Sequence, residues 1–456
     1  MILQISTNAT ETVGFMLSCQ PYHFIAHYRI LIGFLILFGM ICLLLFDIMN
    51  HAVIACLAAS LVLLCLSLSS SLPSIETVVT WMDASTLCLV FSLMIIIQML
   101  STTGCFEYIA CCLYLFSKGN SLLLHFLLCC LTAFLSAFLD NLTTMILLAP
   151  ITIELAHLLK LSPIPFLLPE IIFSNIGGTA TQIGDLPNIM IGSVLNESIT
   201  FIDFISNCLP CVLLCMIILY PLTLLFFRKE FHKKNQAFDP SQVSQYQIKN
   251  KPLCMKCSCI LFTVILLFFF QSHHHINISF IALTGAIACL LLGSNEDLHT
   301  TFELLDWETL MYFAGLFIMT GGLYELGVID VLSSWFISII QSISSSLSST
   351  LLLILWFTGL LSCFIDNVAI ISIMIPIIRI LSSKLQLPIQ PLAWAVAFGS
   401  CFGGNGTLIG AGANLLTAGI SSANGSPISF KQYFTYGFPC TLISLVISSV
   451  YLILRY

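Results

Sequence analysis

The chain has 456 residues, of which 59% are hydrophobic and 8% are charged, with a mean hydropathy of +1.06. A soluble domain carries about 25% charged residues, so this chain has too little charge to cover a surface that is exposed to water. These values exclude a soluble enzyme, a disordered chain and a nucleic-acid-binding protein, and they indicate a polytopic membrane protein. The net charge of −7 adds little. The twenty cysteines lie in apolar runs, where a free thiol behaves as a small hydrophobe.

Apolar stretches of the length needed to cross about 30 Å of hydrocarbon recur along the chain. Residues 1–29 precede the first of them and lack the pattern of a cleavable signal, so we expect a short extracytoplasmic segment there. We predict full-length helices at residues 30–49, 51–71, 84–103, 205–227, 257–271, 277–293, 310–327 and 433–454. The stretches 105–117 and 331–343 are too short to span and are predicted to be interfacial helices.

Four further apolar stretches are interrupted by polar residues or by glycine. Residues 121–160 form two arms around Asp140 and Asn141, and residues 349–385 form two arms around Asp366 and Asn367. Residues 165–196 and 391–424 are apolar at both ends and rich in glycine and threonine at the centre. The first pattern predicts a helical hairpin and the second predicts a broken helix.

A hydrophilic linker at residues 228–256 divides the chain into two halves. It holds seven of the 14 Lys and Arg residues, so the positive-inside rule places it in the cytoplasm. We therefore expect one transporter unit at residues 30–227 and a second at residues 257–456.

The two halves are copies of one another. Adding 226 to a position in the first half gives a matching residue in the second, as in Trp81 and Trp307, or Pro150 and Pro376. The offset holds for more than a hundred residues and changes to 229 near the end. An internal repeat of a membrane unit is typical of secondary transporters.

If each half crosses the membrane five times, the two repeats are inverted and their Asp-Asn sequences meet from opposite faces. This topology places ten cations inside and four outside, with the N-terminus outside. A rival topology, in which the short helices cross, places thirteen cations inside and one outside. Charge therefore favours the rival, whereas helix length favours inversion. We expect an all-α polytopic membrane protein with two inverted repeats and about 10–12 membrane helices.

The Asp-Asn sequences are the first candidate site. An ionisable residue within an apolar stretch is costly and usually marks an ion or proton path. The alternative is that Asp140 and Asp366 only cap the helices that follow them. Ser or Asn could cap without a charge, and the acid occurs twice at equivalent positions. We therefore expect Asp140 to be the titrating group and Asp366 to be a second candidate.

The glycine-rich centres are the second candidate site. Glycine pairs unwind a helix within the membrane, and the freed carbonyls can coordinate a cation while the following half-helix attracts an anion. Close packing of small residues is the alternative. Packing alone does not explain Asp185 or the paired Asn188 and Asn414.

These sequences resemble the ion transporter superfamily. The strings FLDNLTTMILLAPIT and PEIIFSNIGGTATQIGDLPN, with FIDNVAIISIMIPII and GGNGTLIGAGAN in the second half, are similar to the group that contains the melanosomal P protein, the arsenite permeases and the NhaD-type sodium/proton antiporters. The resemblance covers about residues 30–456 and implies a citrate-transporter-like domain whose re-entrant hairpins and broken helices meet near the midplane. The ion- or substrate-binding residues that it implies are Asp140, Asn141, Thr143, Asn175, Gly177, Gly178, Thr179, Thr181, Asp185, Asn188, Asp366, Asn367, Gly403, Gly404, Asn405, Thr407 and Asn414.

The chain departs from the pattern of this family in both halves. Leu186 stands where the family usually has a proline, and Ala369 follows the second Asp-Asn without a hydroxyl. Asn175 corresponds to Cys401, and Asp185 corresponds to Ala411. The second half therefore has fewer oxygen ligands.

The function expected from these features is transport of a small ion, coupled to protons or sodium, with protonation competing with cation binding at Asp140. A dicarboxylate or citrate carrier is an alternative, although the motifs contain no basic residue. A channel-like anion conductance is a third possibility. No motif of a membrane-embedded enzyme is present, so we expect no catalytic activity.

The expected partners are the lipid bilayer, a small inorganic ion or organic anion, and a second copy in a homodimer. No cofactor, nucleic acid or bound metal is expected, because the pair Cys254 and Cys257 has no second pair to complete a zinc site. The plasma membrane and an acidic organelle fit equally well. Glu154, Glu170 and Lys160 flank the first hairpin and are expected to pair with one another, and residues 296–308 are expected to form a solvated acidic loop.

Overall fold

A computed structural model of the chain describes residues 24–46, 48–69, 73–231, 247–293, 295–343 and 346–456. Within these ranges the regular structure is entirely helical, which confirms the all-α class. The expectations for residues 1–23 and for linker residues 232–246 fall outside the described part of the chain.

The first half contains eleven helices. Their bounds are α1 Phe24–Leu45, α2 His51–Leu68, α3 Ile75–Trp81, α4 Ala84–Thr102, α5 Cys105–Ser117, α6 Ser121–Ser136, α7 Asn141–Leu158, α8 Ile164–Gly178, α9 Leu186–Val194, α10 Phe201–Phe226 and α11 Arg228–Phe231.

The second half follows a similar order, with α13 and η2 as additional short elements. Its elements are α12 Lys251–Phe269, α13 Gln271–His274, α14 Ile278–Leu292, α15 Asn295–Glu303, α16 Trp307–Glu325, α17 Val328–Ile343, α18 Leu347–Ser362, α19 Asn367–Leu385, α20 Ile389–Gly403, the 3-10 helix η2 Leu408–Gly410, α21 Gly412–Ala423 and α22 Phe430–Arg455. The bounds of α6 and α18 differ by 226 at both ends, and those of α10 and α22 differ by 229.

Eight described helices are long and apolar enough to cross a membrane: α1, α2, α4, α7, α10, α12, α19 and α22. A ninth span is formed if α16 and α17 are counted together, although α17 bends away from α16 by 75°. Six shorter apolar helices, α5, α6, α8, α14, α18 and α20, complete the bundle. The chain is therefore a multi-pass integral membrane protein.

Polar residues start several of these helices. Asp140 caps α7 by accepting a hydrogen bond from the backbone N–H of Thr143, and Asp366 caps α19 by accepting from Val368 and Ala369. Capping satisfies backbone donors that have no partner within the first turn of a helix. The two arms of each hairpin therefore meet at an aspartate, as the sequence predicts.

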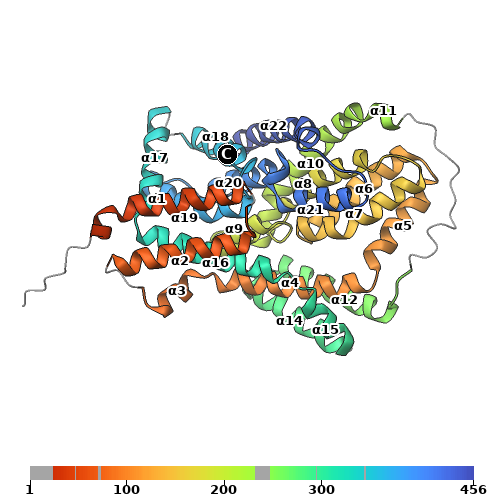
Figure 1. Cartoon of the computed structure of the whole chain (residues 1–456), viewed down its shortest axis with the longest axis horizontal. Helices are drawn as coiled ribbons and strands as arrows, with labels where there is room; N and C mark the ends of the chain where they lie inside the picture. The colour runs from red at the N-terminus through yellow and green to blue at the C-terminus, as the bar shows by residue number, and fades with distance from the viewer. Residues whose placement is uncertain (1–23, 47, 70–72, 232–246, 294, 344–345) are drawn as a thin grey trace, which may run out of the picture.

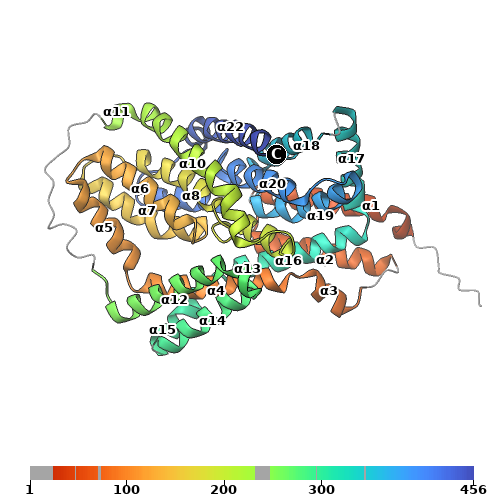
Figure 2. The ribbon, with the colours of Figure 1, turned by 180° about the vertical axis from the view of Figure 1, so that it is seen from behind.

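Most long helices run side by side along the long axis of the molecule (Figure 1). Helices α5 and α17 run across that direction at opposite ends of the bundle, and Figure 2 shows the same arrangement from behind. These are the two helices that the sequence predicts to be interfacial.

The two halves interlock rather than lie apart. Helix α2 packs along α16, and its counterpart α14 packs along α4. The first hairpin contacts the second broken helix through α7 and α21, and the second hairpin contacts the first broken helix through α19 and α9. The interrupted elements of both halves therefore meet in one region of the interior.

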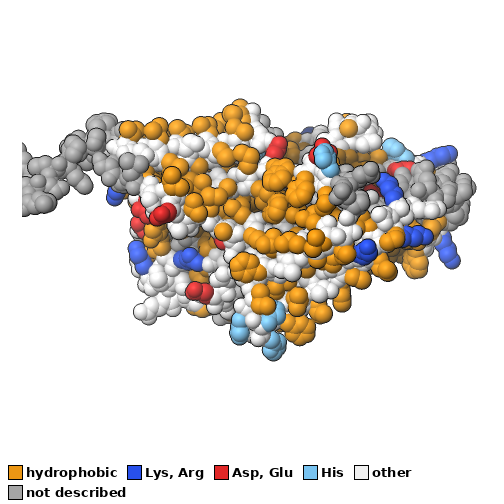
Figure 3. All heavy atoms as spheres, turned by 90° about the horizontal axis from the view of Figure 1, so that it is seen from below, with side chains coloured by type: hydrophobic (Ala, Val, Ile, Leu, Met, Phe, Trp, Pro, Cys, Tyr) orange, Lys and Arg blue, Asp and Glu red, His pale blue; other side chains and the backbone are white. Residues whose placement is uncertain are grey.

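Hydrophobic side chains cover much of the face seen in Figure 3, and Lys and Arg side chains gather toward its two ends. Many large apolar side chains are exposed, such as Leu35, Ile217 and Phe262 with 61%, 68% and 68% of their surface accessible. Exposed apolar surface on this scale suits contact with lipid.

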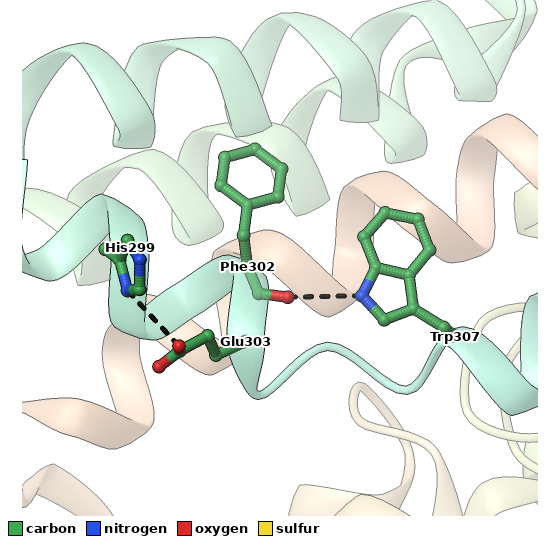
Figure 4. Close-up of polar contacts among 4 residues, drawn as sticks. All are labelled: His299, Phe302, Glu303 and Trp307. Atoms are coloured by element: carbon green, nitrogen blue, oxygen red, sulfur yellow. Dashed lines mark hydrogen bonds and ion pairs between the residues drawn. The ribbon is translucent and has the colours of Figure 1, made fainter.

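The acidic segment before α16 is only partly the solvated loop that the sequence predicts. Its first part is helical, and His299 Nδ1 lies 3.5 Å from Glu303 Oε1 on the surface of α15 (Figure 4). The Trp307 Nε1 atom donates to the carbonyl of Phe302 at 3.1 Å, which ties α15 to the start of α16. This turn places Asp306 and Glu308 beside the interior site.

Candidate functional site

Buried asparagines join the two halves at the centre of the molecule. Asn141 Nδ2 donates to Asn175 Oδ1 at 2.8 Å. Asn175 Nδ2 in turn donates to Asn405 Oδ1 at 2.8 Å and to Asn414 Oδ1 at 3.1 Å. Asn405 and Asn414 are fully buried, and Asn141 and Asn175 nearly so. These four residues, from the first hairpin tip and both broken helices, are called the asparagine cluster below.

The unwound segments between α8 and α9, and between α20 and α21, are held by matching hydrogen bonds. Asn188 Nδ2 donates to the carbonyls of Gly178 and Thr181, each at 3.0 Å. Asn414 Nδ2 donates to the carbonyls of Gly404 and Thr407, at 2.7 and 2.9 Å. Because these four carbonyls have no partner in a continuous helix, the asparagine side chains stabilise both breaks.

Each break is also tied to the hairpin of its own half. The Thr181 hydroxyl donates to the carbonyl of Ala137, and the Thr407 hydroxyl donates to the carbonyl of Cys363. A methyl group added to Gly177 would lie 2.3 Å from the carbonyl oxygen of Ala133, which is sterically forbidden. Glycine is therefore required there by close approach of two backbones, and each hairpin and its broken helix form one packed unit.

Asp366 accepts a hydrogen bond from another helix, whereas Asp140 accepts from groups in the first turn of α7. The Tyr312 hydroxyl donates to Asp366 Oδ2 at 2.7 Å. Asp140 instead accepts from the backbone and the hydroxyl of Thr143, at 2.8 and 2.6 Å. Asn367 Nδ2 lies 3.5 Å from Asp185 Oδ2, which links the second hairpin tip to the first break.

A cavity of about 290 Å³ adjoins the asparagine cluster. Four carboxyl groups line it, those of Asp185, Asp306, Glu308 and Asp366, and its lining includes His51 but no Lys or Arg. We call it the acidic cavity. Asn141 and Asn367 also line it, so it leads to both hairpin tips. Its charge favours entry of a cation over entry of an anion.

A larger cavity of about 780 Å³ lies further along α16 and α19. It is lined by Arg379, whose guanidinium donates to the carbonyl of Val194 at 2.5 Å, and we call it the arginine cavity. Asp83 also lines it, but the Asp83 carboxylate caps α4 and accepts the Thr86 hydroxyl at 2.7 Å. Segments 312–317 of α16 and 368–372 of α19 separate the linings of the two cavities.

The structure brings together most of the site residues that the sequence predicts. Asp140 is set apart from the acidic cavity and lines a small void of about 20 Å³ together with apolar side chains such as Val90 and Phe138. The Thr143 hydroxyl donates to Asp140, and the Thr179 hydroxyl donates to the carbonyl of Asn175, one turn earlier, at 2.9 Å.

Sequence analysis missed Tyr312, Asp306, Glu308 and His51. Asp306 and Glu308 fall in the segment that the sequence predicts to be a solvated loop, and Tyr312 and His51 lie in apolar helices. Asn50, which precedes His51, donates to Glu308 Oε2 at 2.6 Å. The predicted pairing of Glu170 is also wrong, because Glu170 Oε1 accepts from the Thr152 hydroxyl at 2.9 Å and not from Lys160.

Comparison with known proteins agrees with this architecture. The citrate transporter family (CitMHS) matches residues 41–399 and 338–456. The chain is 31% identical over its whole length to the P protein of Mus musculus, and it spans 64% of the length of that relative. The 46 kDa membrane protein of Mycobacterium leprae is 33% identical over 391 residues, with 83% of this chain and 87% of that protein covered. The YdaH transporter of Alcanivorax borkumensis shares the fold, with a TM-score of 0.59 over 93% of this chain and 97% of that chain at 14% identity.

Proposed function

Because the chain belongs to the citrate transporter family, we propose that it is a secondary transporter of a small ion and that protons or sodium drive it. The observation that carries this proposal is the asparagine cluster, which joins the first hairpin tip to both broken helices beside the acidic cavity. Discontinuous helices of this kind form the ion and substrate sites of many secondary transporters.

The chemistry of the cluster suits a hard cation. Sodium is bound by oxygen atoms. The side-chain amides and freed carbonyls supply neutral oxygens, and the carboxylates of Asp185 and Asp366 supply charged ones. The absence of Lys and Arg from the acidic cavity leaves these carboxylates without a fixed positive charge in its lining. A bound proton or sodium ion would supply that charge.

We propose that the acidic cavity and the arginine cavity serve opposite faces of the membrane. The first is lined by the start of α16 and the second by its end, and the same holds for α19. The positions of α5 and α17 at opposite ends of the bundle support this assignment and support inverted repeats with five crossings each (Figure 1).

An organic-anion carrier is the second candidate, and Arg379 favours it. The arginine cavity is large enough for a small carboxylate, since ligand sites commonly measure about 300–1,000 Å³. Arg379 uses one hydrogen bond for Val194 in the structure, and a guanidinium has five N–H donors.

Flux measurements in proteoliposomes distinguish these candidates. Sodium, proton and chloride gradients are imposed one at a time, and uptake of a labelled carboxylate is followed alongside the internal pH and sodium concentration. A coupled cation transporter moves protons or sodium in response to the opposing gradient. A carboxylate flux that depends on Arg379 and needs a cation gradient would favour the second candidate. Flux of chloride alone, without coupling, would contradict both.

A further inference from the structure

A second group of ionisable residues is buried in the first half, away from the asparagine cluster. Glu170 of α8 and His125 of α6 are fully buried, and Cys129 and Thr152 are 1% exposed. The corresponding positions in the second half, obtained by adding 226, are Val396, Leu351, Leu355 and Ile378. The repeat therefore supplies an internal comparison, because the same fold is built there with four apolar side chains.

Glu170 has no ion-pair partner in the part of the chain that the structure describes. Its Oε1 accepts from the Thr152 hydroxyl at 2.9 Å, and its Oε2 has no hydrogen-bond partner among the described residues. A buried carboxylate without a counter-ion is very costly, whereas a neutral carboxylic acid is tolerated when it is hydrogen-bonded. Glu170 therefore suits a site that holds a proton.

His125 lies about one helical turn from Glu170. Helices α6 and α8 run side by side, with the His125 ring 5.7 Å from the Phe166 ring. Phe166 and Glu170 are four residues apart, which corresponds to about 6 Å along the helix. Cys129 lies one turn after His125 on α6, with its Sγ 3.9 Å from His125 Nε2.

These residues form a line from the base of the hairpin toward its tip. His125 is close to the start of α6, where the rings of Tyr220 and Phe231 pack against it at 5.7 and 4.8 Å. Glu170 is five residues before Asn175 in α8, or about 7.5 Å along the helix.

Most of the helices packed against α8 bring no fixed positive charge to this line. Among α6, α7, α10, α20, α21 and α22, only α22 carries Lys or Arg, at its two ends (Lys431 and Arg455). The short helix α11 also packs here, because its Phe231 contacts the rings of His125 and Phe166. It carries Arg228, whose side chain is exposed, together with Lys229 and Glu230. The titratable groups on the other helices are His125, Cys129 and Cys130 of α6, Glu154 and His157 of α7, Asp203, Cys208, Cys211, Cys215 and Tyr220 of α10, Cys401 of α20, and Tyr433, Tyr436, Cys440 and Tyr451 of α22.

We propose that Glu170 and His125 form a proton-binding site of the first repeat, separate from the asparagine cluster, whose proton is exchanged during transport. The exchange of the proton during transport rests on the proposed ion-coupled function. The site itself is independent of the identity of the transported ion. Glu170 holds the proton. His125 is the proton acceptor on the side away from the hairpin tip.

The site is tested by infrared difference spectroscopy of the purified full-length protein between acidic and alkaline buffer. We expect a carboxylic-acid C=O band that disappears at alkaline pH in the unmodified protein and is missing in Glu170→Gln. Glu154→Gln is the matched control, because it removes an acid of α7 and should keep this band. A band that is the same in Glu170→Gln, or one that never changes with pH, would overturn the proposal.

Its role in transport is tested by proton flux in proteoliposomes, read with a trapped pH indicator after a sodium gradient is imposed. We expect Glu170→Gln and His125→Leu to lose the pH-dependent part of the sodium flux while both proteins remain folded. His125→Leu, Cys129→Leu, Thr152→Ile and Glu170→Val together copy the second repeat and guard against a simple packing defect. If the sodium flux of Glu170→Gln depends on pH as it does in the unmodified protein, proton exchange at this site is overturned. Absence of ion flux in the unmodified protein counts against the proposed function, and the infrared result then decides the site alone.

Discussion

Asn175 donates a hydrogen bond to Asn405 at 2.8 Å, although the two residues are 230 positions apart and belong to different halves of the chain. The counterpart of Asn175 in the second half is Cys401, whose Sγ lies 3.5 Å from Asn188 Oδ1. The two broken helices are thus joined by a strong amide contact on one side and a weak thiol contact on the other. The contact that Asn175 makes with the second half is therefore stronger than the contact that Cys401 makes with the first.

Asn175→Ala is expected to lower both stability and transport. The substitution removes the donor to Asn405 and Asn414 and leaves buried oxygens without a partner, which costs about 1–3 kcal/mol of the free energy of unfolding. Thermal unfolding in detergent and flux in proteoliposomes measure the two effects. Cys401→Ala is the matched control and should lower the melting temperature less. A larger effect of Cys401→Ala would contradict the assigned bridge.

Asp366→Asn is expected to impair coupled transport more than Asp140→Asn. Asp366 lines the acidic cavity with Asp185, whereas Asp140 lines a void of about 20 Å³ and binds its own helix. This order is the reverse of the one that ligand counting along the sequence suggests. Initial rates of ion-driven flux for the two variants decide between them.

Tyr312→Phe provides the companion measurement. It removes the hydroxyl that donates to Asp366 at 2.7 Å and should change the apparent affinity for the driving cation. Thr143→Val removes the corresponding hydroxyl from Asp140 and should leave that affinity nearly unchanged. Equal shifts in both variants would contradict the different roles assigned to Asp366 and Asp140.

Gly177→Ala and Gly403→Ala are expected to prevent normal folding. The added methyl groups would lie 2.3 and 2.4 Å from the carbonyl oxygens of Ala133 and Gly359, and neither backbone can move without unpacking the hairpin. Gly419→Ala is the control, because nothing lies within 4 Å of its added methyl group. It should stabilise α21 by up to about 1 kcal/mol. Yield of monodisperse protein and the melting temperature report the difference.

The two cavities are expected to face opposite sides of the membrane. A glycosylation acceptor inserted after Asn196, beside the arginine cavity, should be modified by the lumenal enzyme. The same acceptor inserted after Leu304, beside the acidic cavity, should stay unmodified. Modification of both insertions, or of the second alone, would exclude inverted repeats of five crossings in the orientation proposed here.

The repeat explains how far the sequence predicts this fold. The shift of 226 locates α18 and α19 from α6 and α7, and the helix caps at Asp140 and Asp366 follow from local hydrogen bonding that any reader of the sequence can anticipate. The sequence also shows that the second half has fewer oxygen ligands, because Cys401 and Ala411 stand at the positions of Asn175 and Asp185.

The residues that break the repeat could not be predicted in this way. Tyr312 reaches Asp366 across 54 positions, and Thr152 reaches Glu170 from a different helix. Such contacts depend on which faces of the helices meet, and in a helix that is apolar on every side periodicity does not mark the facing side. Asp306 and Glu308 were missed for a different reason, because they fall in the acidic segment 296–308 and the sequence does not show that the start of α16 borders a cavity.

The interior carboxyls have one electrical consequence. The hydrogen bonds to Asp140, Asp185 and Asp366 come from neutral groups, those of Thr143, Asn367 and Tyr312. An ionised carboxylate that moves through the membrane field does work of about 2.3 kcal/mol per charge for each 100 mV. A site neutralised by a cation moves without that work. Under the proposed ion-coupled function, the membrane potential would therefore bias the orientation of the empty protein and act little on a protein whose carboxylates are neutralised by bound cations.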